Sequence, residues 1–567
     1  MKKFALFIAL LFLFSCGSGS KTETFSMASV LDFSVFEGKI AIDSNKINQL
    51  KNEDLKLFYK KYEYATVWHN EDFRASVLAE IKKAEEEGLE STDYNYKFLY
   101  ETHQKYDALP DSTLINYDIN FTENFQKYIT HLSKGKINPN TFYKDCDLGK
   151  KEIDVNKIAF ESIDKNNFSE VLENCKPQHI IYKKLKWCLK KLKNMPNDNF
   201  GVIDLSEKIV FNKKNRNVPL LKKKLMYWGD MTKKDTILST LYDKDTQEAV
   251  KKFQERHGLK PDGVVGRSTL DALNYSRDQR IEQIVANLER WRWFQHDFGN
   301  SYLLINIPDY TIVAVKDNDT LIAQKVVVGK DTRRTPMLES KITNINLNPN
   351  WTVPPTILKE DIFPEAEKDR GEFKKRGLVI LDKKNNEVNP WTWKKEDANK
   401  YKYVQNPGEN NSLGLMKINF LNKFAVYLHD TNHRDYFKYT YRALSSGCVR
   451  LEKPLEMATY LLNDNEKWPI EKIQDTTNIK HYIKLQKEKE KEYNKKVAKL
   501  LAKNPTLEIP EKKWPKPELK TIVIKIDDDI KIHQLYWTAW EKDEILQFRE
   551  DIYCLDHDIF AKLRYKK

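Results

Sequence analysis

HDTNHRDYFKYTYRALSSGCVR, residues 429–450, is the most informative stretch of this 567-residue chain. It begins with His429, directly after the apolar, strand-like run FAVYL, and it ends with Cys448 set among small residues. A thiolate nucleophile needs a base or a cation nearby and a backbone that a substrate can approach. The stretch therefore predicts a site for acyl transfer at the end of a strand, with Cys448 as the nucleophile and His429 as the general base.

The residues around Cys448 have expected roles of their own. Gly447 permits a strained turn and a close approach of the substrate to the backbone. Ser446 is expected to hydrogen-bond and orient the imidazole of His429, or to hold the turn. Arg450 is expected to hold the turn or an anionic group of the substrate.

Two other interpretations of the same residues stay open. A free cysteine is commonly a packed and inert core residue, so a structural role for Cys448 is the first alternative. The segment 430–432 has turn chemistry, which disfavours a metal site built on helical i, i+4 spacing. Such a metal site is the second alternative, because two histidines and two aspartates lie close together in the chain: His429, Asp430, His433 and Asp435.

The pair HD at 429–430 and the block SSGCVR at 445–450 resemble the catalytic signature of the L,D-transpeptidases, the YkuD-like family. Ser446 stands where many members carry a second histidine. The upstream block NSLGLMK, residues 411–417, is similar to the larger, YcbB-type subgroup. The resemblance implies a β-sandwich-like catalytic domain that requires neither a metal nor an organic cofactor.

The resemblance also implies a reaction on peptidoglycan stem peptides. Cys448 would attack the L,D-bond of a stem tetrapeptide and expel the terminal D-alanine. The side-chain amine of a neighbouring stem would then resolve the thioester into a 3→3 cross-link. His429 would move the protons, and backbone N–H groups at Gly447 and Cys448 would meet the oxyanion. Carbapenems are expected to acylate the same cysteine, and the expected substrate-binding residues are Arg450, Tyr427 and Asn411.

Two further functions remain as alternatives. If water resolves the thioester, the protein is an L,D-carboxypeptidase or endopeptidase that trims stem peptides. The other alternative is a lipid-anchored tether that binds peptidoglycan without any catalysis. Such a tether has no use for the combination of Cys448, His429 and Arg450, which therefore favours an enzyme.

The composition favours packed domains beside an acidic neighbour. The chain is 40% hydrophobic and 12% aromatic, which excludes wholesale disorder. Its formal net charge is +13, but 83 acidic residues are interleaved with 96 basic ones along the whole chain. This spread disfavours nucleic acid as a partner and favours an anionic envelope polymer or a membrane surface.

The N-terminus has the pattern of a bacterial lipoprotein signal. Two lysines precede an apolar run, residues 4–14, that is too short to span a membrane as a mature helix. The LFSC ending resembles a lipoprotein cleavage box, which implies lipidation of Cys16, and plain secretion is the alternative. Either way the protein is exported. We expect it to be periplasmic and held by its lipid in a membrane, the outer membrane being favoured.

The chain contains six cysteines, and lipidation of Cys16 leaves an odd number. One thiol is then free, and Cys448 is the natural candidate. Two of the three cysteines in the first half of the chain can pair, in a combination that the sequence does not define: Cys146, Cys175 and Cys188.

The chain is predicted to be a multidomain α+β protein. AVKKFQERHGLKPDGVVGRSTLDAL, residues 249–273, resembles a three-helix peptidoglycan-binding domain whose first long helix starts at Asp245. β-branched runs separated by turns from Ser301 onward predict an antiparallel, sandwich-like sheet. The expected organisation is a signal peptide (1–16), a tether (17–36), a helical scaffold (37–205), a peptidoglycan-binding domain (206–277), a catalytic domain (278–483) with a capping insert (356–403), a charged and Pro-rich linker (484–520) and a C-terminal strand and tail of the catalytic domain (521–567).

Overall fold

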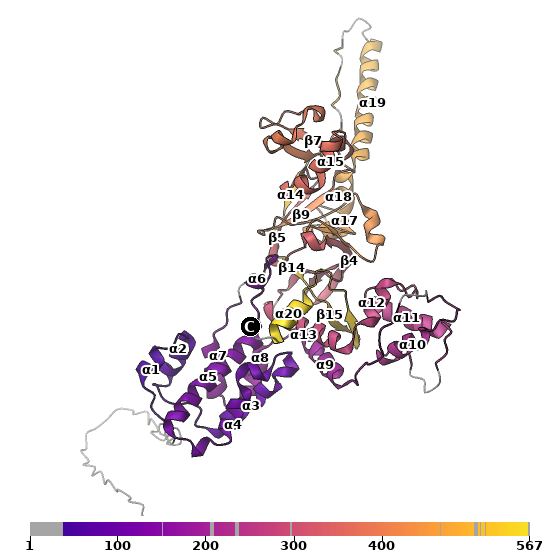
Figure 1. Cartoon of the computed structure of the whole chain (residues 1–567). Coiled ribbons are helices and arrows are strands. Elements are labelled where there is room, and N and C mark those ends of the chain that lie inside the picture. The colour runs from indigo at the N-terminus through magenta and orange to yellow at the C-terminus, as the bar shows by residue number, and fades with distance from the viewer. Residues whose placement is uncertain are drawn as a thin grey trace, which may run out of the picture.

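The computed structural model describes residues 38–149, 151–204, 209–232, 238–294, 298–464, 466–503, 509–510, 512–515 and 517–564. Within them the protein is a multidomain α+β molecule, as predicted. Figure 1 shows two separate helical units on either side of a central helix, α13 (Arg277–Trp293), with a β-rich domain beyond them. The expected lipidation site at Cys16 and the tether 17–36 lie outside the described residues.

The N-terminal helical unit packs around one long helix, α5. Buried Asp118 of this helix accepts hydrogen bonds from the Tyr59 hydroxyl at 2.6 Å and from the Trp68 N–H at 2.7 Å. Such bonds compensate a carboxyl group for the loss of water, and they fix the chain before α3 against α5. The helices of this unit are α1 (Ser44–Asn48), α2 (Glu53–Lys61), α3 (Glu71–Lys82), α4 (Tyr96–His103), α5 (Asp111–Lys134), α7 (Val155–Asp164) and α8 (Phe168–Cys175). Two further helices of this part of the chain lie elsewhere: α6 (Pro139–Phe142) is next to β1, and α9 (Ile180–Asn194) packs against α13 in the core of the β-rich domain.

The second helical unit contains α10 (Val218–Tyr227), α11 (Lys244–Arg256) and α12 (Arg267–Asn274). The prediction that the middle helix starts at Asp245 is one residue late, because α11 begins at Lys244. Asp243 is the N-cap, because its side chain accepts a hydrogen bond from the Thr246 N–H at 2.9 Å. Asp243 and Asp245 both carry the acidic side chain that a helix start favours, so the sequence pattern alone does not show which of them is the N-cap.

Helix α13 connects the other parts of the molecule. Its fully buried Arg290 pairs with Asp556 of α20 (Asp556–Arg564), a helix that follows the last strands of the sheet. Glu289 of α13 accepts a hydrogen bond from the Ile137 N–H at 2.8 Å, on the N-terminal helical unit. Buried charges are tolerated only when they are paired, so these contacts define how the parts are joined.

The β-rich domain is a sheet whose strands follow the order β1-β5-β14-β2-β3-β4-β12-β10-β9, and β9 also pairs with β5. The path therefore closes on itself, and the two long strands β4 and β5 contribute to both layers of a sandwich-like fold. The strands are β1 (Cys146–Asp147), β2 (Ser301–Asn306), β3 (Thr311–Lys316), β4 (Asp319–Gly329), β5 (Met337–Leu347), β9 (Met416–Phe420), β10 (Leu428–His429), β11 (Ala443–Ser445), β12 (Val449–Leu451), β13 (Ile522–Lys525) and β14 (Lys531–Leu535), with a separate hairpin of β15 (Ala539–Lys542) and β16 (Ile545–Phe548).

The sheet is mixed, whereas an antiparallel sheet was predicted. β14 pairs in parallel with β2, and β10 pairs in parallel with β12. The hairpins formed by β2, β3 and β4 are antiparallel, as local turn signals predict. Parallel pairs join segments that are far apart in the sequence, so no turn signal announces them.

A small subdomain interrupts the sheet between β5 and β9. It has a three-stranded sheet in the order β6-β8-β7 and a core of its own, in which the Trp393 indole N–H donates to the Tyr403 hydroxyl at 2.7 Å. We call residues 353–403 the cap. Its elements, with the flanking strands, are β6 (Trp351–Thr352), α14 (Pro355–Ile357), the π-helix η7 (Leu358–Ile362), α15 (Phe363–Lys368), α16 (Glu372–Lys375), β7 (Leu378–Leu381), η8 (Pro390–Thr392), η9 (Lys395–Lys400) and β8 (Lys402–Gln405).

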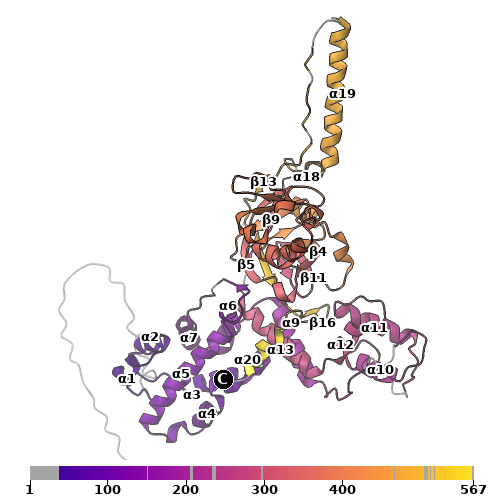
Figure 2. The ribbon, with the colours of Figure 1, turned by 45° about the horizontal axis from the view of Figure 1, so that its top comes forward.

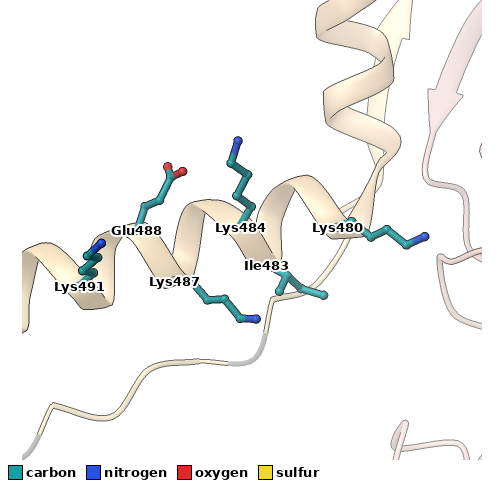
Figure 3. Close-up of a pocket in the computed structure, with 6 residues that line it drawn as sticks. All are labelled: Lys480, Ile483, Lys484, Lys487, Glu488 and Lys491. Carbon is teal, nitrogen blue, oxygen red and sulfur yellow. The ribbon is translucent and has the colours of Figure 1, made fainter.

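After β12 come α17 (Pro454–Leu462), α18 (Ile470–Thr477) and α19 (Ile479–Lys503). Figure 2 shows α19 projecting from the β-rich domain, away from both helical units. None of its side chains is buried, and Figure 3 shows lysines pointing outward from its first turns. The Lys/Glu-rich part of the predicted linker is a helix, as its pattern predicts, and it begins at Ile479 instead of Lys484. Across the described residues, we find no helix with both the length and the apolar character needed to cross a membrane.

Candidate active site

The candidate site lies on one face of the layer formed by β9, β10 and β12. His429 on β10 is directly opposite Arg450 on β12 and Lys417 on β9. Leu428 and Val449 alternate with these residues and are fully buried in the core. Because successive side chains of a strand point to opposite faces, His429, Arg450 and Lys417 share the outer face. Two charged residues thus flank the imidazole from either side.

Cys448 and Tyr427 form the next row on the same face. The Val449 N–H donates to the Tyr427 carbonyl at 3.1 Å, which sets Tyr427 beside Cys448. The Tyr427 side chain hydrogen-bonds Cys448, and its ring lies 3.9 Å from Lys417 Nζ. The ring centroids of Tyr427 and His429 are 5.6 Å apart. The structure therefore brings together the predicted residues Cys448, His429, Arg450 and Tyr427.

The tautomer of His429 follows from a backbone contact. Its Nδ1 lies within hydrogen-bond distance of the Asp430 carbonyl, which can only accept, so Nδ1 carries the hydrogen. Nε2 is then unprotonated and can take up a proton. Burial lowers the pKa of His429 to about 3, and the charges of Arg450 and Lys417 act in the same direction. His429 is thus a neutral base at every physiological pH.

The thiol of Cys448 is protonated in the resting site. Burial raises its pKa, while the hydrogen bonds of Tyr427 and the charges of Lys417 and Arg450 act in the opposite direction. A buried thiol beside a neutral imidazole is not a preformed ion pair. The arrangement is suited to general-base catalysis, in which His429 takes the proton as the sulfur attacks.

The turn before Cys448 is tightly held. Gly447 has φ +109°, and a Cβ there would lie 3.2 Å from the Arg334 carbonyl, so glycine is required on both counts. The Ser445 hydroxyl donates to the Cys448 carbonyl at 2.6 Å and accepts from the Gly447 N–H at 3.1 Å. The Gly447 N–H expected for the oxyanion is therefore occupied by Ser445 in this form of the protein.

Ser446 does not lie on His429. Its hydroxyl accepts a hydrogen bond from Arg333 Nη1 at 2.9 Å, on the side of the turn that faces the cap. The group that holds the imidazole is the Asp430 carbonyl instead. Neighbouring residues of a turn point in different directions, which is why nearness in the sequence suggested a contact that is not formed.

Arg450 lies against Thr431 and Tyr436. Its Nη1 donates to the Thr431 hydroxyl at 3.3 Å, and the guanidinium carbon lies 5.6 Å from the centroid of the Tyr436 ring. Its Nε is buried and has no hydrogen-bond partner among the described residues.

Asn411 has a different place from the one predicted. It is buried, and its side-chain N–H groups donate to the carbonyls of Pro349 at 2.9 Å and Asn406 at 3.0 Å. Its side-chain oxygen accepts from the Leu413 N–H at 2.8 Å. Asn411 therefore ties the two ends of the cap to the loop before β9, and its polar atoms are used in that role.

Lys417 is a site residue that the sequence analysis passed over as part of a motif. Burial lowers its pKa, and it is close enough to Cys448 for each group to affect the pKa of the other. The signal that would have found it is the pairing of β9 with β10, which puts Lys417 opposite His429. A single strand in the sequence does not reveal such a register.

Removing the charge of Lys417 is expected to weaken the nucleophile. In Lys417→Met the pKa of the Cys448 thiol should rise, and its alkylation by iodoacetamide at neutral pH should slow about tenfold for each unit of that rise. The difference from the parent should shrink at high pH, where both thiols ionise. Lys423→Met, which removes an exposed lysine paired with Asp147, is the control. Equal alkylation rates in Lys417→Met and the parent at all pH values would contradict this role.

The residues of the metal alternative have separate partners. Asp430 accepts from Arg434 Nη1 at 2.9 Å and from the Leu415 N–H at 2.9 Å, and the His433 ring stacks on Tyr436 at 4.9 Å. Over the described part of the chain, no group of three or more His, Cys, Asp and Glu side chains could hold a metal ion. The five described cysteines are free thiols, including the three considered for pairing: Cys146, Cys175 and Cys188.

Three segments of the chain match known protein families. Residues 300–470 match the L,D-transpeptidase catalytic domain, 53–189 match the Scaffold domain, and 214–273 match the "Putative peptidoglycan binding domain". The face with Cys448 and His429 lies in the first segment. Residues 300–470 are therefore similar to the L,D-transpeptidase catalytic domain of the YkuD family, and this similarity covers less than a third of the chain. With the scaffold and peptidoglycan-binding domains, the chain has an architecture consistent with the YcbB type, as the sequence predicted.

A curated relative covers part of the chain. It is the "Putative L,D-transpeptidase" of Haemophilus influenzae, 37% identical over 193 residues, which are 33% of this chain and 39% of that protein. Two solved L,D-transpeptidase structures were also matched. That from Xylanimonas cellulosilytica is 15% identical, covers 46% of this chain and 94% of its own, and has a TM-score of 0.16. That from Stackebrandtia nassauensis is 17% identical, covers 44% and 88%, and has a TM-score of 0.19.

Proposed function

We propose that the protein is an L,D-transpeptidase that forms 3→3 peptidoglycan cross-links through a thioester on Cys448. The observation that carries this proposal is the shared face on which Cys448 lies beside Tyr427, diagonal to His429, with Lys417 and Arg450 on either side of the imidazole. These groups are a nucleophile, a neutral base and two cations. The match of residues 300–470 to the L,D-transpeptidase catalytic domain supports the same chemistry.

In the first half-reaction, the sulfur of Cys448 attacks the carbonyl carbon of the third residue of a stem tetrapeptide. Nε2 of His429 takes the thiol proton, and the oxyanion is met by backbone N–H groups of the turn, with the Cys448 amide as the first candidate. The carbon–nitrogen bond then breaks. The terminal D-alanine leaves after its nitrogen takes the proton from His429, and the carbonyl carbon remains bound to sulfur as a thioester.

In the second half-reaction, the side-chain amine of a neighbouring stem attacks the thioester. His429 accepts a proton from that amine and returns it to the sulfur as the carbon–sulfur bond breaks. A new amide bond joins the two stems, and Cys448 is a thiol again. Arg450, which lies opposite His429 on the same face, is assigned to a carboxylate of the donor stem.

Hydrolysis of the same thioester is the second candidate function. The site supports hydrolysis because water can take the place of the acceptor amine. The thioester on Cys448 is the same in both reactions. The cap argues for aminolysis, since a lid over the thioester excludes water. Trp351, at the edge of the cap, hydrogen-bonds Tyr427 next to Cys448 and so extends the cap region to the reacting sulfur.

The rest of the chain is assigned to localisation and substrate supply. We propose that Cys16 carries the lipid that holds the protein in the outer membrane, facing the periplasm. The units at 37–205 and 206–277 would then position the catalytic domain (278–483 and 521–567) on glycan strands, and carbapenems would acylate Cys448.

The experiment that tests the proposal is incubation of the purified protein with disaccharide-tetrapeptide, followed by mass spectrometry of the products. A cross-linked dimer with release of D-alanine is the expected result. A tripeptide without any dimer would assign the protein to the carboxypeptidases. Unchanged tetrapeptide, together with retention of the protein on insoluble peptidoglycan, would favour the non-enzymatic tether.

A further inference from the structure

A short loop after β4 lies between the cap and the catalytic turn. It contains the 3-10 turn η6 (Asp331–Arg333) and leads into β5. The loop starts at Gly329, where a Cβ would lie 2.2 Å from the Arg333 carbonyl, so its backbone is folded closely on itself.

Arg333 holds the cap with two carboxylates. Its Nε donates to Glu360 Oε2 at 3.0 Å, and its two terminal nitrogens donate to Asp361 at 2.5 and 2.8 Å. Both carboxylates belong to η7, the π-helix at the start of the cap. π-Helical turns are rare and are frequent at functional sites. One side chain therefore makes a forked contact with the part of the cap that is least regular in backbone.

The same loop holds the catalytic turn. Arg333 Nη1 donates to the Ser446 hydroxyl at 2.9 Å, and the Thr335 hydroxyl donates to the Gly447 carbonyl at 2.8 Å. The Thr335 N–H in turn donates to the Tyr553 hydroxyl at 3.1 Å, which anchors this end of the loop in the C-terminal segment. The two residues directly before Cys448 are thus fixed from the loop that also binds the cap.

The three charged side chains of this contact differ in their exposure to solvent. The Arg333 side chain is 10% exposed, whereas those of Glu360 and Asp361 are 53% and 36% exposed. The carboxylates are therefore closer to solvent than the cation, and salt weakens the pair from their side. If the pair opens, the largely buried Arg333 loses the carboxylates that compensate its charge.

We infer that Arg333 is a positioning residue that links closure of the cap to the geometry of the turn at Ser446 and Gly447, and that it thereby favours the amine over water as acceptor. This inference rests on the proposed function. When the cap is closed, Arg333 is held by Glu360 and Asp361 and presents Nη1 to Ser446. When the cap opens, Arg333 loses four hydrogen bonds to the cap and the turn loses its fixed partner.

The test compares Arg333→Met with Arg334→Met, which removes the neighbouring arginine of the same loop and its ion pair with Asp331. The readout is the ratio of cross-linked dimer to tripeptide produced from disaccharide-tetrapeptide. Arg333→Met is expected to lower this ratio at least about fivefold, within the range of ordinary coupling energies between sites. Arg334→Met should leave it unchanged. Hydrogen exchange of residues 358–368 should become faster in Arg333→Met alone.

A second comparison distinguishes loss of the Arg333 contact from misfolding of the loop. Glu360→Gln with Asp361→Asn removes the carboxylate charges from the cap and leaves Arg333 in place, and it should lower the ratio as Arg333→Met does. Combining all three substitutions should add nothing further. Raising the salt from about 0.05 M to about 0.5 M should lower the ratio in the parent but not in Arg333→Met.

The outcomes separate this inference from the proposed function. If the parent forms no dimer and no thioester, the proposed function fails. If the parent forms dimer and Arg333→Met keeps the same ratio and the same exchange rates, only the role of Arg333 is overturned. Equal losses in Arg333→Met and Arg334→Met would also overturn it, because they would reflect general damage to the loop.

Discussion

Replacing Cys448 by alanine is expected to abolish thioester formation and cross-linking, a loss of at least about 10³-fold in kcat/KM. The groups of the site act on the sulfur of Cys448. Tyr427 hydrogen-bonds it, and the charges of Lys417 and Arg450 lower its pKa against the effect of burial. Alanine keeps the main-chain bond from the Val449 N–H to the Tyr427 carbonyl, so the face itself should survive. The measurement is the intact mass of the protein after exposure to tetrapeptide stems.

The matched control for this substitution is Cys554→Ala. Cys554 is an exposed free thiol in the C-terminal segment, so it reports on adducts that form on any accessible cysteine. The expected pattern is an adduct on the parent and on Cys554→Ala, and none on Cys448→Ala. A dimer formed by Cys448→Ala at the parental rate would show that Cys448 is not the acyl carrier.

The local parts of the fold could be predicted from the sequence. The hairpins from β2 to β4 depend on alternating β-branched residues and on turns that are adjacent in the chain, so their signals are complete within a short window. The order of Gly447, Cys448 and Arg450 along the chain could likewise be recognised within one short motif. The fold class followed from these signals, and the family matches agree with it.

The non-local parts could not be predicted in this way. Lys417 reaches the site only because β9 pairs with β10 in one register, and Arg333 reaches Ser446 across 113 residues of sequence. Asn411 was assigned to the substrate because it belongs to the right motif, but its amide is fully used by the carbonyls at the ends of the cap. Contacts of this kind depend on tertiary packing, which composition and periodicity do not encode locally.

Replacing His429 by glutamine is expected to lower kcat/KM about 10²- to 10⁴-fold, the usual contribution of a positioned general base. Glutamine cannot take up the thiol proton. Since burial lowers the pKa of His429 to about 3, the parent should keep a neutral base down to that pH, and its acid limb should lie well below the ordinary histidine pKa of 6.5. The rate of His429→Gln should instead rise with pH up to the raised pKa of the Cys448 thiol. The pH profile of thioester formation is the measurement.

The same group should make the catalytic domain sensitive to acid. The pKa of His429 is lower in the folded state than its ordinary value of 6.5, so the unfolded state binds the proton more readily between these values. Its contribution to stability is therefore complete above pH 6.5 and is lost progressively as the pH falls toward about 3, in total about 5 kcal/mol. His429→Gln should lose less stability over this interval than the parent. His433→Gln, which replaces an exposed histidine of the same loop, is the control and should resemble the parent. An acid limb near pH 6.5 in the parent, or equal acid sensitivity in all three proteins, would mean that His429 is not the buried neutral base that its contact with the Asp430 carbonyl implies.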